Sequence, residues 1–172
     1  MTQPSSAIDA LPVLLRREIE ARVLAPFVDA LAAEFGRERV IEILRSTIVA
    51  IAREQGEALA ARQGRRDLAD FAEATAAWTK EDALAIDVLE HTSERYHFNV
   101  TRCRYAEMYR ALGIPELGAL LSCNRDAALI EGYHPGVQLT RSTTLMQGGS
   151  CCDFRYELIQ GSPSTNVPGV KS

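Results

Sequence analysis

The chain has 172 residues, of which 47% are hydrophobic and 24% are charged, and its formal net charge is −4. This length and composition suit one domain with a hydrophobic core and exclude a disordered or low-complexity chain. The acidic balance argues against a nucleic-acid binder, which needs a basic surface. No apolar run reaches the roughly 18 residues of a membrane span, and residues 1–10 lack the basic and apolar segments of a signal peptide. We therefore expect a cytoplasmic protein without nucleic-acid or membrane partners.

The first 80 residues are expected to be helical. Apolar residues recur at helical spacing over residues 11–34, and Pro26 is expected to kink this helix or split it in two. Gly36 is expected to end it. A second helix is predicted over residues 38–63, with Gly64 closing it.

A third helix is predicted to start at Asp67, whose side chain suits the N-cap position, and to carry Leu68, Phe71 and Trp78. The apolar stripe of the N-terminal helices has two interpretations. It is an ordinary core or dimer face, or it is a surface that receives a helix of a partner. We expect a homodimer or a higher homo-oligomer.

The period of the pattern then changes from helical to alternating. Residues 84–91 and 95–102 alternate apolar and polar side chains, and the segment between them is rich in turn formers, which predicts a β-hairpin. Two helical pieces are expected next, over residues 104–112 and 115–130, the second beginning at Pro115.

A second pair of extended runs is predicted over residues 137–146 and 152–159. The turn between them, residues 147–150, contains two glycines. The fold class is therefore α+β: N-terminal helices followed by a four-stranded antiparallel sheet of two hairpins, with helices inserted between the hairpins. Residues 1–160 are expected to form a single domain, and residues 161–172 a flexible tail.

The residues with the most reactive side chains are concentrated in one part of the chain. All four cysteines and all three histidines lie between residues 91 and 152. In a reducing compartment these cysteines are free thiols rather than a disulfide framework. We therefore searched this region for candidate functional residues.

The predicted second strand carries one group of candidates. Alternation places His97 and Asn99 on the face opposite Phe98, and Arg102 and Cys103 follow where the strand ends. This polar face either lines a ligand pocket or faces solvent, and the sequence alone leaves both possibilities open.

Cys123 and Asp126 form the second group. At positions i and i+3 they share a helix face. A thiol beside a carboxylate can act as a nucleophile with its proton-transfer partner, or the two can ligate one metal. The alternative is that Cys123 is simply a small buried side chain.

The last two groups lie in the second hairpin. Gly148 opens a stretch in which glycine amides can approach an anion, and Cys152 and Asp153 follow it. Arg141 has the fork geometry that binds a carboxylate through two hydrogen bonds. The alternatives are an ordinary hairpin turn and an arginine that faces solvent.

Over residues 83–158 the chain resembles the L-2-amino-thiazoline-4-carboxylic acid hydrolase family. The resemblance rests on short motifs whose order and spacing match: residues 98–109, Leu112-Gly113, Glu116-Leu117-Gly118, Cys123-x-x-Asp126, Pro135, Leu139-x-Arg141-Ser142-x-Thr144, Gly148 and residues 152–156. The layout of cysteines and glycines is also similar to that of the 4-vinyl reductase type of ligand-binding domain.

The resemblance implies hydrolytic opening of a C–N bond in a small cyclic amidine, such as the 2-aminothiazoline ring. In this interpretation the thiolate of Cys123 or Cys103 attacks, Asp126 moves the proton, and Arg102 or Arg141 binds the substrate carboxylate. The other substrate-binding candidates are His97, Asn99, Gly148, Cys152 and Asp153. No cofactor and no metal is required.

The covalent mechanism needs a thiol pKa below its ordinary value, and the positive field of Arg102, Arg104 and Arg125 is expected to supply this. Three alternatives stay open. The first is a metal-bound water held by ligands from Cys103, Cys123, Asp126 or Asp153. The second is a non-catalytic binding or sensor domain, and the third is a pathway enzyme with isomerase or cyclase chemistry.

Overall fold

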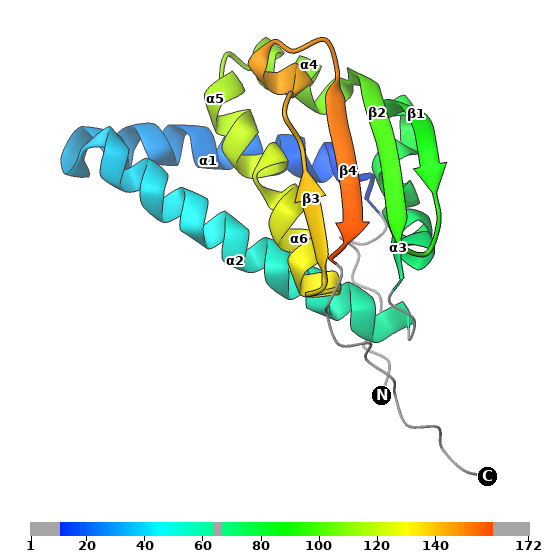
Figure 1. Cartoon of the computed structure of the whole chain (residues 1–172). Helices are drawn as coiled ribbons and strands as arrows, with labels where there is room; N and C mark the ends of the chain where they lie inside the picture. Colours follow the sequence, from blue (N-terminus) through cyan, green and yellow to red (C-terminus); the bar gives the residue numbers. More distant parts are fainter. Residues whose placement is uncertain (1–10, 64–66, 160–172) are drawn as a thin grey trace.

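A computed structural model of the chain describes residues 11–63 and 67–159. Its elements form two layers, a four-stranded antiparallel sheet and a set of helices that covers one face of that sheet (Figure 1). The predicted α+β class is confirmed. The expected flexible tail and the helix end at Gly64 lie outside the described residues.

The sheet consists of the two hairpins expected from the alternating patterns. Strands β1 (Leu84–His91) and β2 (Arg95–Cys103) pair antiparallel, as do β3 (Val137–Thr140) and β4 (Cys152–Leu158). The hairpins join through β2 and β4, so the strand order is β1-β2-β4-β3. In this register Val100 lies opposite Cys152, which brings two of the candidate regions together.

The N-terminal helices are α1 (Val13–Phe35) and α2 (Arg37–Gln63). Gly36 ends α1 as expected and adopts a positive φ of 83°, a conformation that glycine accepts without strain. Pro26 does not split α1, because a single helix continues through it.

Helix α3 (Leu68–Thr75) starts at Asp67, which forms a capping box with Asp70. It is shorter than expected. Trp78 lies instead in the following 3₁₀ segment η2 (Ala76–Asp82).

The segment between the hairpins is less regular than expected. Helix α4 (Arg104–Ala111) ends before Gly113, and the single helix predicted over residues 115–130 is three pieces. These are α5 (Pro115–Gly118), the π-helix η3 (Ala119–Cys123) and α6 (Arg125–Tyr133). Short π-helical insertions are frequent at functional sites.

The extended run predicted over residues 137–146 was too long, because β3 ends at Thr140. Asp153 accepts hydrogen bonds from the backbone amides of Ser142 and Thr143, so these amides are not available to a sheet ladder. The chain then forms the 3₁₀ segment η4 (Leu145–Gln147) before β4 begins.

Helices α2 and α6 are packed backbone against backbone. A Cβ atom on Gly56 would lie 2.1 Å from the carbonyl oxygen of Leu129, and one on Gly132 would lie 2.1 Å from that of Arg53. This close approach fixes the C-terminal half of α6 against α2, and Arg125 and Asp126 lie in the first turn of the same helix.

The inner face of the sheet and the helices enclose the hydrophobic core. Phe98, Val100, Phe154 and Tyr156 point into it from β2 and β4. Among residues 11–63 and 67–159, no helix is long and apolar enough to cross a membrane.

Candidate functional site

A cavity of about 490 Å³ lies between the inner face of the sheet and the helices. Its walls come mainly from α1, α2, η2, η3 and α6 and from strands β2 and β4. Five of the residues singled out from the sequence line it together: Cys103, Cys123, Asp126, Arg141 and Cys152. They come from four separate segments of the chain, so the fold assembles this group.

Each of the three cavity thiols sits at the end of an element. Cys103 is the N-cap of α4, and its sulfur accepts a hydrogen bond from the amide of Ala106 at 3.4 Å. Cys152 begins β4 and accepts from the amide of Leu145 at 3.1 Å. Cys123 is the last residue of the π-helix η3. No hydrogen bond to the Cys123 sulfur occurs among the described residues, so this thiol is the least constrained of the three.

Asp126 and Arg141 form an ion pair in the wall of the cavity. The side chains are only 19% and 15% exposed, and one guanidinium nitrogen of Arg141 donates to Asp126 Oδ2. A second nitrogen donates to the carbonyl oxygen of Cys123 at 2.9 Å, and the guanidinium lies 4.9 Å from the centre of the Phe154 ring. Arg141 therefore ties the carboxylate of Asp126 to the backbone of Cys123.

Burial dominates the electrostatics of the cavity. It raises the pKa of the Cys123 thiol to about 12; the carboxylate of Asp126 adds to this shift and Arg141 opposes it. Burial likewise raises the pKa of Cys103 to about 11. The pKa of Asp126 is raised too, because burial outweighs the favourable charge of Arg141.

The expectation of a lowered thiol pKa is therefore wrong for the free protein. Of the three arginines expected to supply the positive field, Arg102 pairs with Glu107 on the surface and Arg104 donates to the carbonyl oxygen of Glu81. Arg125 does line the cavity, but burial of the thiols outweighs the arginines there.

Three other predicted site residues lie on the outer face of the sheet. His97 lies 3.5 Å from Glu90 and 3.0 Å from Glu157. Asn99 accepts a hydrogen bond from Arg155, and Asp153 accepts from Ser142 and Thr143. Strand alternation sends these side chains away from the cavity, which is lined by their neighbours on β2 and β4.

Gly148 and Arg102 are also outside the cavity. Gly148 is exposed and has a φ of 91°, and its amide donates to the carbonyl oxygen of Leu145 within the turn. Its amide is therefore not free to hold an anion. Arg102 is exposed at the end of β2 and uses two nitrogens on Glu107.

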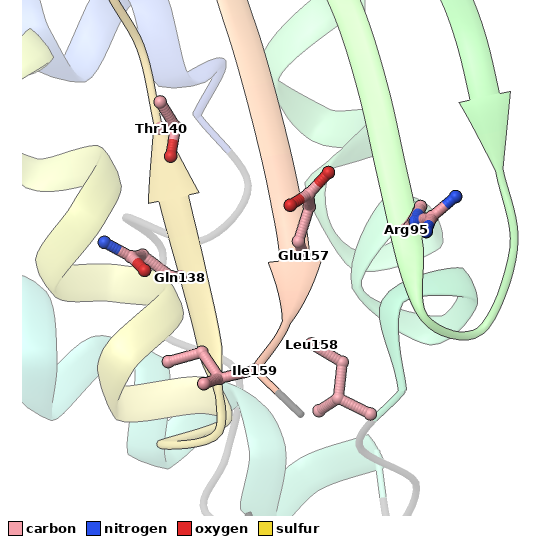
Figure 2. Close-up of a pocket in the computed structure, with 6 residues that line it drawn as sticks. All are labelled: Arg95, Gln138, Thr140, Glu157, Leu158 and Ile159. Atoms are coloured by element: carbon pink, nitrogen blue, oxygen red, sulfur yellow. The ribbon is translucent and has the colours of Figure 1, made fainter. Parts of the chain in front are cut away.

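The outer face has its own, smaller depression of about 350 Å³, shown in Figure 2. It is lined by the ends of β2, β3 and β4 and contains Arg95, Glu157 and Thr140. It contains neither a thiol nor a buried carboxylate, which leaves the inner cavity as the better candidate for chemistry.

Sequence reasoning missed several residues that line the cavity. Arg16 and Arg17 come from α1, Gln55 from α2 and Trp78 from η2. Arg125 was noted only for its charge. A signal for it exists: Leu121, Arg125 and Ala128 follow one buried helix face, so a charge stands where the pattern calls for an apolar residue.

The four side chains suggested from the sequence as metal ligands, those of Cys103, Cys123, Asp126 and Asp153, do not all lie together. Asp153 lies on the opposite face of the sheet from Cys123 and Asp126. Within the described part of the chain, no group of three or more His, Cys, Asp or Glu side chains is placed to hold a metal ion.

Solved structures share this fold at low sequence identity. A trafficking protein particle complex subunit 3 from Naegleria fowleri, covalently bound to palmitic acid, aligns with a TM-score of 0.50 and 14% identity, covering 84% of this chain and 95% of that one. The phenol-responsive sensory domain of the transcription activator PoxR, with phenol, aligns with a TM-score of 0.50 and 10% identity, covering 79% of this chain and 73% of that one. At these identities the likeness shows the fold alone.

A comparison with curated proteins gives no significant match. The comparison with protein families does, and it extends beyond the segment from which the resemblance was drawn. The family model of L-2-amino-thiazoline-4-carboxylic acid hydrolase matches residues 16–156, which include most of α1, all of α2 and every cavity residue named above. The chain belongs to the L-2-amino-thiazoline-4-carboxylic acid hydrolase family.

Proposed function

We propose that the cavity hydrolyses a small cyclic amidine that carries a carboxylate, such as 2-aminothiazoline-4-carboxylate, and opens its ring. The observation that carries this proposal is the grouping of Cys123, Asp126 and Arg141 in one wall of the cavity. Family membership supplies the class of substrate. The cavity volume of about 490 Å³ lies within the range of small-molecule sites.

Cys123 is the nucleophile in this proposal. Its sulfur attacks the amidine carbon, the double-bond electron pair moves onto nitrogen, and Asp126 accepts the thiol proton. Asp126 then protonates the ring atom that leaves when the ring opens. Water then attacks the same carbon, Asp126 takes one of its protons and returns it to the Cys123 sulfur as the bond between that sulfur and the carbon breaks, so the sum is the addition of one water to the substrate.

The raised thiol pKa shapes this mechanism. With a pKa of about 12, Cys123 is almost wholly protonated at neutral pH, so its proton must leave as the sulfur attacks. The thiol is still a stronger acid than water. A base of given strength therefore activates the thiol more readily than it activates a water molecule, which favours the covalent mechanism.

Asp126 suits the role of general acid and base. Burial raises its pKa above the ordinary value for aspartate, which makes its carboxylate a stronger base than a free one. Arg141 holds the carboxylate in place beside Cys123. Arg141 thus acts as a positioning residue here, rather than as the carboxylate anchor suggested from the sequence.

The direct test incubates the purified protein with 2-aminothiazoline-4-carboxylate and follows the product by mass spectrometry. We expect a gain of one water. A free amine in the product identifies cleavage of the C–N bond inferred from the sequence, and a free thiol identifies cleavage of the C–S bond. No turnover of this compound or of related carboxylated cyclic amidines would contradict the proposal.

The raised pKa values of Cys103 and Cys123 also favour a second candidate, a domain that binds such a ligand without converting it. Trp78 lines the cavity and is the one tryptophan of the sequence, so its fluorescence reports binding directly. A fluorescence change on addition of the ligand, without any product, would identify this candidate.

We also propose that the chain forms a homodimer through the arm made by the end of α1 and the start of α2. This arm extends away from the sheet in Figure 1. It carries large apolar side chains that are 39–64% exposed: Val23, Phe27, Leu31, Phe35 and Ile43. A fully exposed aromatic side chain presents roughly 200 Å², so these side chains present several hundred Å² together, a large part of the roughly 800 Å² that one partner contributes to a standard interface.

A second copy of the chain is the occupant that suits this face, because a symmetric pair buries the same apolar side chains on both subunits. Sedimentation analysis is expected to give a dimer for the wild type and a monomer for Phe27→Asp. Leu89→Asp, at a 58% exposed apolar position on β1, is the control and is expected to stay dimeric. A monomeric wild type at micromolar concentration would contradict the proposal.

A further inference from the structure

The cavity holds more positive than negative charge. Five arginines line it, Arg16, Arg17, Arg62, Arg125 and Arg141, against two carboxylates, Glu20 and Asp126. Each carboxylate already has a partner, since Arg17 pairs with Glu20 and Arg141 with Asp126. The other three arginines bring positive charge that no carboxylate in the cavity wall neutralises.

Arg125 is the most unusual of these residues. It is only 7% exposed, and among the described residues no carboxylate pairs with it. Within the described part of the chain, its guanidinium donates one hydrogen bond, to the neutral side-chain oxygen of Gln55 at 2.5 Å. A buried guanidinium with a single neutral partner has most of its five donors free for a ligand.

Electrostatics within the cavity agrees with this geometry. Burial lowers the pKa of Arg125 to about 10, and the positive charge of Arg17 contributes to the shift. A buried positive charge that is neither paired nor hydrated is costly, and a bound anion would remove that cost.

Arg16 supplies a second unfilled donor from α1. Its Nε atom is buried and makes no hydrogen bond. Buried donors are nearly always paired in native proteins. An orphaned N–H in a residue that lines the cavity is therefore a feature that a ligand would complete.

We propose that Arg125, assisted by Arg16, forms an anion subsite that holds the carboxylate of the substrate. The inference rests on the proposed function for the identity of the substrate, but the subsite itself requires only a small carboxylate ligand. It replaces both anchors suggested from the sequence, because Arg102 is outside the cavity and Arg141 is committed to Asp126 and Cys123. The subsite explains how this cavity would select a carboxylated ring over its neutral analogue.

The test measures binding of two probes, 2-aminothiazoline-4-carboxylate and the same ring without its carboxylate, to the full chain carrying Cys123→Ala to prevent turnover. Calorimetry gives the affinity, and Trp78 fluorescence confirms that the cavity is the site. We expect the carboxylated probe to bind roughly 10- to 100-fold more tightly, as hydrogen bonds to a charged group suggest.

Inorganic phosphate is added as a competitor to distinguish a carboxylate site from a general anion site. Weak competition supports the proposal, and tight phosphate binding would overturn its assignment to a carboxylate.

Three variants locate the subsite. Arg125→Gln is expected to remove most of the preference for the carboxylated probe, and Arg125→Lys is expected to restore part of it, because the charge returns without the fork. Arg16→Gln, at a position that is less buried, is expected to reduce the preference by a smaller factor. Arg22→Gln removes an equal charge from an exposed position on the same helix and is expected to leave both affinities unchanged.

Thermal unfolding shows whether each variant is folded. If Arg125→Gln does not fold, Arg16→Gln still tests the subsite. Equal affinity of the two probes for the parent protein, or an unchanged preference in folded Arg125 and Arg16 variants, would overturn the subsite. Tight and selective binding without turnover in the wild type would instead support the subsite and contradict the proposed reaction.

Discussion

The two faces of the sheet carry similar polar residues but use them differently. On the outer face, His97, Asn99 and Asp153 are engaged by neighbouring side chains or by the adjoining loop. On the inner side, the Cys123 sulfur and most donors of Arg125 remain free and face a cavity. The hydrogen bonds of Asn99 and Asp153 hold the strands and the adjoining loop in place, whereas the free groups beside the cavity are available to a ligand.

Asp126→Asn should produce a large change in turnover, because it removes the proposed proton acceptor on the inner face. The amide still accepts from Arg141 but cannot take up the thiol proton, so kcat/KM is expected to fall about 10²–10⁴-fold. In the wild type, kcat/KM is expected to fall as the pH drops through the pKa of Asp126, which lies above the ordinary value for aspartate. Steady-state kinetics with a pH series measures both effects. Retention of activity within about threefold in a folded variant would remove Asp126 from the reaction.

The second prediction concerns the order in which the thiols react. Cys123 and Cys103 have pKa values of about 12 and 11, so both carry very little thiolate near neutral pH. Alkylation by iodoacetamide between pH 6 and 9, followed by peptide mass spectrometry, is expected to label both more slowly than Cys151, which lies outside the cavity lining. Rapid labelling of Cys123 below pH 7 would instead indicate a preformed thiolate.

Most of the fold follows from local patterns. The change from helical to alternating spacing located β1 and β2, Gly36 marked the end of α1, and Asp67 marked the start of α3. These features depend on backbone conformation and on which face of an element is buried. Residues close together in the sequence determine both.

The site was only partly predictable because it depends on contacts between distant segments. Strand alternation separated Phe98 from His97, but it did not tell which face would meet the helices. The pairing of β2 with β4 places Cys152 opposite Val100, and no local pattern encodes that register. In the sequence, Arg16 and Arg17 look like ordinary surface residues of a helix. They line the cavity only because α1 packs over it.

The third prediction concerns stability on the outer face. Although burial opposes it, the hydrogen bonds from Ser142 and Thr143 lower the pKa of Asp153 to about 2. The ionised carboxylate therefore stabilises the fold above its unfolded-state pKa near 3.8, and this stability is lost as the pH falls towards 2. Asp153→Asn is expected to lower the free energy of unfolding at pH 7 by about 1–2 kcal/mol and to flatten its dependence on pH in this window. Denaturant unfolding at several pH values measures both quantities. A large loss of kcat in a variant that is still fully folded under assay conditions would contradict the assignment of Asp153 to the outer face.

The smallest effect is expected for His97→Gln. Its side chain is 16% exposed, but the carboxylates of Glu90 and Glu157 that it contacts are 36% and 57% exposed, and such solvated contacts contribute about 0–1 kcal/mol. The variant should keep its turnover and unfold within about 1 kcal/mol of the wild type. A substantial loss of turnover at unchanged stability would mean that the outer face takes part in the reaction.

The most direct test of the central claim compares Cys123→Ala with Cys151→Ala in the ring-opening assay. The two variants remove the same atom, one from the cavity and one from outside its lining. We expect Cys123→Ala to lose at least about 10³-fold in kcat, as removal of a nucleophile does, and Cys151→Ala to match the wild type. Full turnover by a folded Cys123→Ala protein would contradict the covalent mechanism, and with it the claim that the free thiol on the inner face carries the chemistry.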